Sequence, residues 1–188
     1  DRIIFAMVGG QAGSGTAASY NGVSMTQIGS SLNCGGNRNI SLWYLINPAS
    51  GSHTVSVTRS SSSGWTLGYA VSYTGAKQSG VPDATSSTNQ GESSSFTETL
   101  TTVADNCWVV LAAGSQDDGL SAGTNATTVY ANSLEMSFFD NSGYGSISPA
   151  GSFGMTIGNS GDTTYSTIMA SFEPAEQPAK GKSFAQIF

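Results

Sequence analysis

Strand-like segments recur roughly every 10 to 20 residues along the chain, and the periodicity of an amphipathic helix is missing almost everywhere. Residues 2–8 form an apolar run that ends at two glycines, and residues 53–58 alternate between polar and apolar side chains. Asn21-Gly22, between two such runs, is typical of a two-residue hairpin turn. The pattern predicts an all-β fold, specifically a two-sheet antiparallel β-sandwich with about ten strands.

The composition supports a folded chain with few charges. Of the 188 residues, 38% are hydrophobic and 10% aromatic, so the chain carries enough apolar surface for a core, although only 10% are charged. Twelve acidic residues against six basic ones give a sequence pI near 4.4, which disfavours nucleic acid and anionic membranes as partners. No apolar run approaches the roughly 20 residues that a membrane helix requires, so we expect no membrane insertion.

Two segments depart from the strand pattern. Residues 75–95 are mostly polar and hold Val81, beside Pro82, as their one branched aliphatic side chain, which predicts a long loop or an irregular sheet edge. After residue 173 the chain becomes linker-like and then ends in an apolar alternation. The expected organisation is therefore a sandwich domain at 1–173, followed by a linker and apolar C-terminal tail at 174–188.

The tail carries three large apolar side chains, Phe184, Ile187 and Phe188, which we expect to dock on another surface. A frayed terminus is the alternative interpretation. At the other end the chain begins with Asp1 and not Met, and strand-like sequence starts at Arg2. We therefore expect the natural reading frame to continue upstream and the protein to be extracellular or on a virion surface.

The two cysteines leave two alternatives open. Cys34 lies in a Gly/Asn-rich run and Cys107 opens an apolar strand. A disulfide between them would close a long loop and stabilise the fold by about 4 kcal/mol. Two buried free thiols are the other alternative, because cysteine often behaves as a small apolar residue.

Catalytic chemistry finds little support in the sequence. His53 is the only histidine and lies in an expected strand, and a Ser-His-Asp triad would need it as the base. The acids expected within strands are Glu98 and Glu135, and for both a solvent-facing position is the simple interpretation. Glu98 shares the parity of Phe96 and Leu100, so an inward orientation or a place at a sheet edge is the alternative for that residue. We expect a protein that is not an enzyme and that uses no cofactor.

Calcium is the one metal to consider, because Asp117 and Asp118 precede a glycine in a polar loop that also holds Asn125. The spacing matches no EF-hand, and Asp-Gly is also a common turn. The sequence therefore predicts no established metal site.

Several segments together resemble a known module. They are residues 1–5, 19–26, 42–57, 70–75 and 172–175, and the stretch Trp-Tyr-Leu-Ile-Asn-Pro at 43–48 is the most specific. In this order they resemble a lectin-like, jelly-roll β-sandwich module of bacterial surface proteins and phage structural proteins. The resemblance covers roughly residues 1–175 and implies the fold, but it brings no catalytic motif.

Two functions follow as expectations. The first is a non-catalytic structural or display module of an extracellular assembly, such as a virion decoration, a fibre or a surface-filament subunit, whose copies associate through terminal segments. The alternative is a glycan-binding module of a secreted or cell-surface protein, with Trp65 and Tyr144 stacking on sugar rings. For Trp65, a place at the edge of the core is the competing interpretation. The expected partners are copies of the chain or other subunits, and surface glycans under the alternative.

Overall fold

The computed structural model describes residues 1–116, 119–132, 135–161 and 163–176. This part of the chain contains fifteen strands and no helix, and every strand pairing in it is antiparallel. The fold is therefore an all-β sandwich, as the sequence predicts. No helix of the described residues is long and apolar enough to cross a membrane.

Two larger sheets form the centre of the molecule. Inner sheet 1 has the strand order β4-β5-β1-β7, and inner sheet 2 has the order β12-β13-β10-β15-β8. Their strands are β1 (Arg2–Gln11), β4 (Thr26–Asn33), β5 (Arg38–Ile46), β7 (Thr66–Thr74), β8 (Ala84–Glu92), β10 (Trp108–Ser115), β12 (Thr127–Asn132), β13 (Met136–Asp140) and β15 (Thr164–Phe172). A core that includes Phe5, Leu42, Phe138 and Ile168 fills the space between them.

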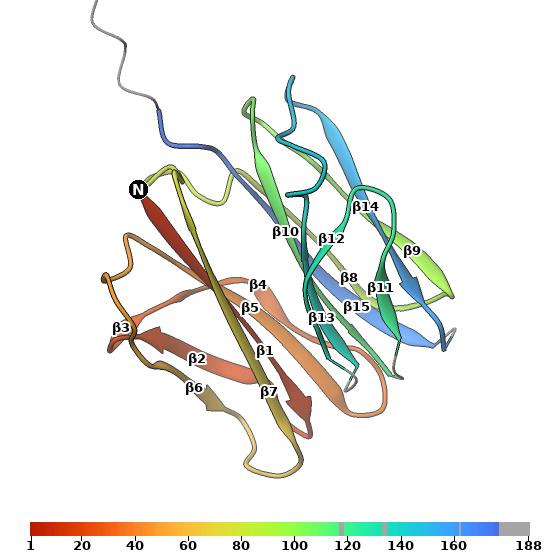
Figure 1. The fold of residues 1–188 in the computed structure, drawn as a ribbon. Helices are drawn as coiled ribbons and strands as arrows, with labels where there is room; N and C mark the ends of the chain where they lie inside the picture. The colour runs from red at the N-terminus through yellow and green to blue at the C-terminus, as the bar shows by residue number, and fades with distance from the viewer. Residues whose placement is uncertain (117–118, 133–134, 162, 177–188) are drawn as a thin grey trace, which may run out of the picture.

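A smaller sheet covers the other face of each inner sheet, so Figure 1 shows four layers of strands. Outer sheet 1 has the order β3-β2-β6, and outer sheet 2 has the order β11-β14-β9. Their strands are β2 (Gly15–Tyr20), β3 (Val23–Ser24), β6 (Val55–Arg59), β9 (Ser95–Thr101), β11 (Leu120–Ala122) and β14 (Ser152–Asn159). Separate apolar clusters fill each outer interface.

This layering explains why β1 and β10 are apolar along almost their whole length. In β1, Ile3, Phe5 and Met7 face the central core, whereas Ile4 and Ala6 face outer sheet 1. A strand buried on both faces has no solvent side, so its sequence reads as a continuous apolar run and not as an alternation. Strands of the outer sheets bury one face and alternate, as β9 does along its seven residues.

The strand number and sheet number differ from the sequence expectation of about ten strands in two sheets. The polar stretch at 75–95 accounts for part of the difference, because it contains β8 at the edge of inner sheet 2. Backbone pairing with β15 holds β8 in place, from Ala84 opposite Ser171 to Glu92 opposite Thr164. An edge strand built from small hydroxyl side chains lacks the apolar alternation by which strands are recognised.

The two halves of the chain repeat one topology, which no sequence pattern revealed. In each half the chain begins with the central strand of an inner sheet and passes to the outer sheet. It then forms two further strands of the inner sheet, a second strand of the outer sheet, and a last inner-sheet strand that pairs with the central strand. Thus β1, β2, β4, β5, β6 and β7 correspond in order to β10, β11, β12, β13, β14 and β15. Figure 1 shows the first half in red to yellow and the second in green to blue.

Contacts across the central core repeat as well. Gly9 pairs with Ile40 in inner sheet 1, and Gly114 pairs with Met136 in inner sheet 2. A Cβ atom added at Gly9 would overlap Met136, and one added at Gly114 would lie 2.6 Å from Cγ2 of Ile40. The glycine of each half therefore contacts the large side chain that is paired with the glycine of the other half. This exchange defines a local twofold relation between the halves.

Candidate functional site

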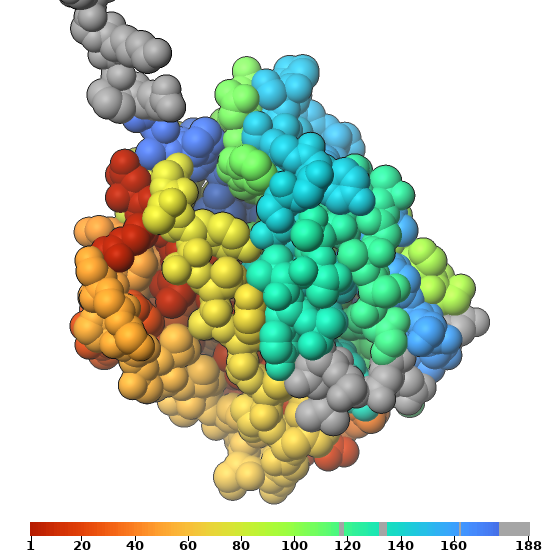
Figure 2. Space-filling view, viewed as in Figure 1, coloured from red at the N-terminus to blue at the C-terminus, as the bar shows by residue number. Residues whose placement is uncertain are grey.

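A cleft of about 480 Å³ opens between the two inner sheets at the end where β1 begins. Its wall is mostly apolar and includes Ile3, Phe5 and Phe172. The cleft lies beside the seam along which β7, yellow in Figure 2, meets the green and teal residues of the second half. Concave apolar sites with a few polar groups are the usual places for ligands or docking segments.

One polar pair is built into this apolar wall. The Tyr73 hydroxyl donates a hydrogen bond of 2.8 Å to Oδ2 of Asp140, and the backbone N–H of Ser142 donates to Oδ1 at 2.9 Å. Asp140 is 6% exposed. Burial raises the pKa of Tyr73 far above its usual value, and the bond to Asp140 and its charge raise it further. The phenol therefore stays protonated and acts as a hydrogen-bond donor, and the other carboxylate on the cleft wall, Glu173, is paired with Lys77.

Exposed aromatic side chains lie at this same end of the sandwich. Trp108 lines the cleft and is 43% exposed, and Tyr144, in the loop after β13, is 55% exposed. Asn141 holds this loop in place, because its side chain accepts from the Val109 N–H at 2.9 Å and donates to the Gly145 carbonyl at 2.8 Å. A fixed loop with an exposed ring is suited to stacking on a flat ligand face.

The structure does not bring together the two aromatic residues that the sequence singled out. Trp65 is half-buried against the central core, and its carbonyl accepts from Gln11 at the far end of β1. Tyr144 belongs to the cleft end of the molecule, as do Ile3 and Val109. Eight positions of β1 separate Ile3 from Gln11, or roughly 26 Å of extended strand. Trp65 therefore takes the core-edge position that competed with a sugar contact.

Trp108 is the residue that sequence reasoning missed. It stands first in an apolar block, and a Trp in such a block reads as a core residue. In the structure it lies at the end of β10, where the strand leaves the core, whereas Val109 to Ala113 are buried. The exposure of Trp108 could be predicted only in part. Side chains at strand ends are often exposed in a sandwich, but the exact end of a strand is the least certain feature of a sequence-based prediction.

The cysteines are both free and buried, so the disulfide alternative is wrong. Cys34 packs beside Gly114 near the end of β10, whereas Cys107 directly precedes β10 and donates to the Ala104 carbonyl. Seven residues of β10 separate the two places, which is roughly 23 Å of extended strand. A disulfide requires Cα atoms closer than about 7 Å. Burial raises the pKa of each thiol to about 12.

The expected catalytic candidates lie apart from one another. His53 precedes β6 instead of lying in a strand, is exposed, and its ring contacts the Ser50 carbonyl and the Tyr20 ring. Glu98 points inward, the alternative left open by its parity, and accepts hydrogen bonds from Thr88 and Thr167 at 2.7 and 2.5 Å. Neither residue has a neighbouring group with which to form an acid–base pair among the contacts of the described chain.

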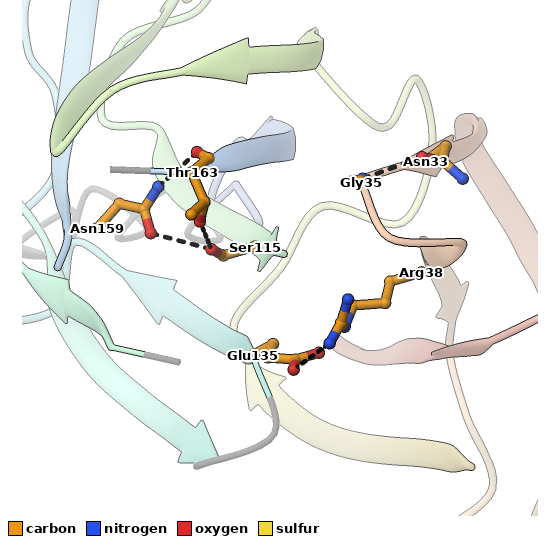
Figure 3. A network of polar contacts seen from close by, with 7 residues as sticks. All are labelled: Asn33, Gly35, Arg38, Ser115, Glu135, Asn159 and Thr163. Atoms are coloured by element: carbon orange, nitrogen blue, oxygen red, sulfur yellow. Dashed lines mark hydrogen bonds and ion pairs between the residues drawn. The ribbon is translucent and has the colours of Figure 1, made fainter. Parts of the chain in front are cut away.

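Glu135 has a structural role at the opposite end of the sandwich. It lies in the turn before β13 and not within a strand, and it forms a two-bond ion pair with Arg38 at the start of β5. Figure 3 shows this pair near a second polar cluster, in which the Ser115 hydroxyl donates to Asn159 at 2.9 Å and contacts Thr163. These contacts join the halves and tie down loops, and none of them lines the cleft.

The described residues include neither the calcium candidates nor the apolar tail residues. No group of three or more His, Cys, Asp or Glu side chains positioned for a metal occurs in the described chain. Asp117 and Asp118, the calcium candidates, lie outside the described residues, as do Phe184, Ile187 and Phe188 of the tail. The fold and the cleft thus define a layered β-sandwich with an apolar cleft at one end.

Comparison of the chain with protein-family models, with curated proteins and with solved structures gave no match. The functional argument therefore rests on the geometry of this molecule.

Proposed function

We propose that this protein is a non-catalytic structural or display module of an extracellular or virion-surface assembly, such as a virion decoration, a fibre or a surface filament. Copies of the chain, or other subunits, associate through its terminal segments. The lectin-like, jelly-roll resemblance of residues 1–175 is consistent with such a role, since modules of this kind occur in surface and phage structural proteins.

The observation that carries the proposal is the unprotected edge of inner sheet 1. β7 forms this edge, and among the described residues it pairs with β1 alone. Its nine residues contain no Lys and no Pro, the residues by which soluble proteins usually block an exposed edge. An open edge offers unpaired backbone groups to an added strand, and the apolar tail at 183–188 has the composition of such a strand.

Deletion of residues 183–188 tests the association. We expect the full chain to form oligomers whose mass rises with concentration in light scattering, and the deleted chain to remain a folded monomer. The control replaces Gln177 by Ala in the linker, which leaves the apolar tail intact. Equal association of the full and deleted chains, or a full chain that stays monomeric at millimolar concentration, contradicts the proposal.

Glycan binding is the second candidate, and the exposure of Trp108 and Tyr144 at the cleft end favours it. The Tyr144→Ala variant should lose at least about tenfold in affinity for a bound oligosaccharide, because stacking of a ring on a sugar face depends on the aromatic plane. Val103→Ala, which removes another exposed side chain, is the matched control. A glycan screen with no ligand, or equal affinity of both variants, contradicts this candidate.

A further inference from the structure

The repeated halves differ at one edge. In the second half, β8 covers the outer edge of β15. In the first half, β7 stands in the position of β15, and none of the described strands covers its outer edge. Among the described residues, inner sheet 1 therefore has no strand equivalent to β8.

The exposure of the two equivalent strands reflects this difference. Leu67 pairs with Gly9 and Ser166 pairs with Gly114, so β7 and β15 correspond at an offset of 99 positions. At this offset Leu67, Tyr69, Val71 and Tyr73 match Ser166, Ile168, Ala170 and Phe172. The four residues of β15 are buried. Their four counterparts in β7 are only half-buried, although these side chains are as large as or larger than those of β15. Inner sheet 1 thus lacks the cover that β8 gives to inner sheet 2.

The chain leaves both strands in a symmetric manner. After β7 and after β15 it crosses itself, with Ala76 bridged to Pro174. The Lys77 N–H donates to the Glu173 carbonyl at 3.0 Å, and the Ala175 N–H donates to the Gly75 carbonyl at 2.7 Å. From this crossing, residues 77–83 lead to β8 on the second half. An equivalent path beyond residue 176, drawn by the same twofold relation, ends at the open edge of β7.

We infer that residues 183–188 of this chain form a strand on the outer edge of β7, in the place that β8 occupies on β15. The offset of 99 positions between β7 and β15 carries Ala84, the first residue of β8, onto Ser183, and the tail linker at 173–182 is one residue longer than the linker at 75–83. β8 pairs Ala84 with Ser171 and Thr85 with Ala170. The same register sets Ser183 opposite Ser72, Phe184 opposite Val71 and Ala185 opposite Ala70.

This register fits the chemistry of both strands. Side chains alternate between the two faces of a sheet, so Phe184 and Phe188 fall on the face of Val71 and Leu67, toward the central core. Ala185 and Ile187 fall on the face of Ala70 and Gly68, where nothing lies within 4 Å of a Cβ atom placed at Gly68. On the core face, the added strand would cover the half-buried residues of β7 with apolar side chains. On the other face, the open space beside Gly68 accommodates its side chains.

The cleft is the counterpart of a groove that the first linker fills. Val81 of that linker packs against the central core, and its carbonyl accepts from the Tyr44 hydroxyl at 2.8 Å. Tyr44 pairs with Phe5 and Asp140 pairs with Val110, so Asp140 takes the place of Tyr44 in the second half. The tail brings Lys180 to the position of Val81, which sets a cation against the buried carboxylate.

The docking within one chain goes beyond the proposed function, because it needs no neighbour. Exchange of the same segment between copies, which leaves every strand pairing intact, is a low-cost route to the association proposed above. The isolated monomer should nevertheless keep the segment on its own β7 edge, since the linker at 75–83, one residue shorter, spans the equivalent distance within one chain.

Paired cysteines test the register in the full chain. With Ala70→Cys and Ala185→Cys together, we expect a disulfide within one chain in the monomer fraction under mild oxidation, identified by peptide mass. Ala70→Cys with Gln186→Cys is the matched control, because the two side chains then lie on opposite faces of the sheet. The native thiols compete poorly, since burial raises the pKa of both to about 12. No crosslink, or equal yield in the control, overturns the inference.

A crosslink found only between chains also overturns it, while it supports association of copies through the tail. Hydrogen exchange gives a second measurement that does not depend on the cysteine variants. The β7 amides that point away from β1 should exchange at least about tenfold more slowly in the full chain than in the Ala185→Pro variant. Proline has no N–H group to donate to a neighbouring strand. Ala179→Pro, in the linker, is the control. Equal exchange in all three chains contradicts an added strand.

Discussion

Single glycines set the distance between the two inner sheets. Gly9 and Gly114 lie within apolar strands where any side chain would fit the sequence pattern, and neither has a positive φ. Their role is steric, because Met136 and Ile40 occupy the space in which a Cβ atom would lie. Interiors are packed closely enough that one added methyl group must displace a neighbour.

Replacement of Gly114 by Ala should therefore destabilise the protein by about 1–3 kcal/mol, because the new methyl group meets Ile40 and Cys34. Gly68→Ala, in the exposed outward position of β7 with open space around it, should change stability by less than about 0.5 kcal/mol. Urea unfolding followed by tryptophan fluorescence measures both. Equal stability of the two variants contradicts the packing argument.

The free thiols give a pH dependence with a defined sign. Burial raises the pKa of Cys34 and Cys107 from an ordinary value of 9.0 to about 12 in the folded chain. The unfolded chain releases these protons first, so stability is fully present below pH 9 and falls as the pH rises toward 12. The slope of unfolding free energy against pH should be smaller in Cys34→Ala than in the native chain. An unchanged slope between pH 9 and pH 12 contradicts the prediction.

At the scale of the elements, the contacts that join the halves lie at both ends of the sandwich. The chain crossing at Ala76 and Pro174 connects the halves at the cleft end, and the Arg38–Glu135 ion pair connects them at the other end. Arg38 and Glu135 keep only 19% and 13% of their side-chain surfaces exposed. The pair is thus more shielded than an ordinary surface ion pair, and its planar two-bond geometry fixes the turn before β13 against β5.

Replacement of Glu135 by Gln should cost about 1–2 kcal/mol, between the values of exposed and buried pairs, because Arg38 keeps one acceptor but loses its counter-charge. Lys77→Gln, which removes the more exposed ion pair with Glu173, should cost less than Glu135→Gln, because solvent screens exposed charges. Thermal unfolding at low and high salt measures both effects. An equal loss in the two variants would show that shielding does not govern the strength of these pairs.

Across the whole molecule, neither half has a complete core. The central core draws Phe5 and Leu42 from one inner sheet and Phe138 and Ile168 from the other. β8 also continues the chain of the first half but pairs with the second. Separation of the halves therefore exposes one apolar face of each inner sheet and removes the partner of an edge strand.

A chain divided after Gly80 tests this interdependence. We expect residues 1–80 alone to show no cooperative unfolding, because the inner face of inner sheet 1 loses its partner. Mixed with residues 81–188, the fragment should recover a single cooperative transition in circular dichroism. A cooperative transition in the isolated first fragment would show instead that outer sheet 1 is sufficient to stabilise it.

The sequence alone determined the fold class, the apolar core strands and the absence of helices from the described residues, because side-chain alternation and turn residues act within a few positions of the chain. Asn21-Gly22, for instance, lies in a turn between β2 and β3 whatever surrounds it. The same local rules predict the buried runs that became β1 and β10. Residue parity also raised the inward orientation of Glu98 as an alternative.

Only the tertiary structure decided the number of layers, the place of β8, the separation of the cysteines and the exposure of Trp108. Each of these depends on contacts between residues distant in sequence. β8 is a strand because β15 offers it a backbone ladder, and its own side chains give no such signal. The twofold relation of the halves likewise resides in strand order and in pairs such as Gly9 with Met136, which amino-acid similarity between the halves does not record.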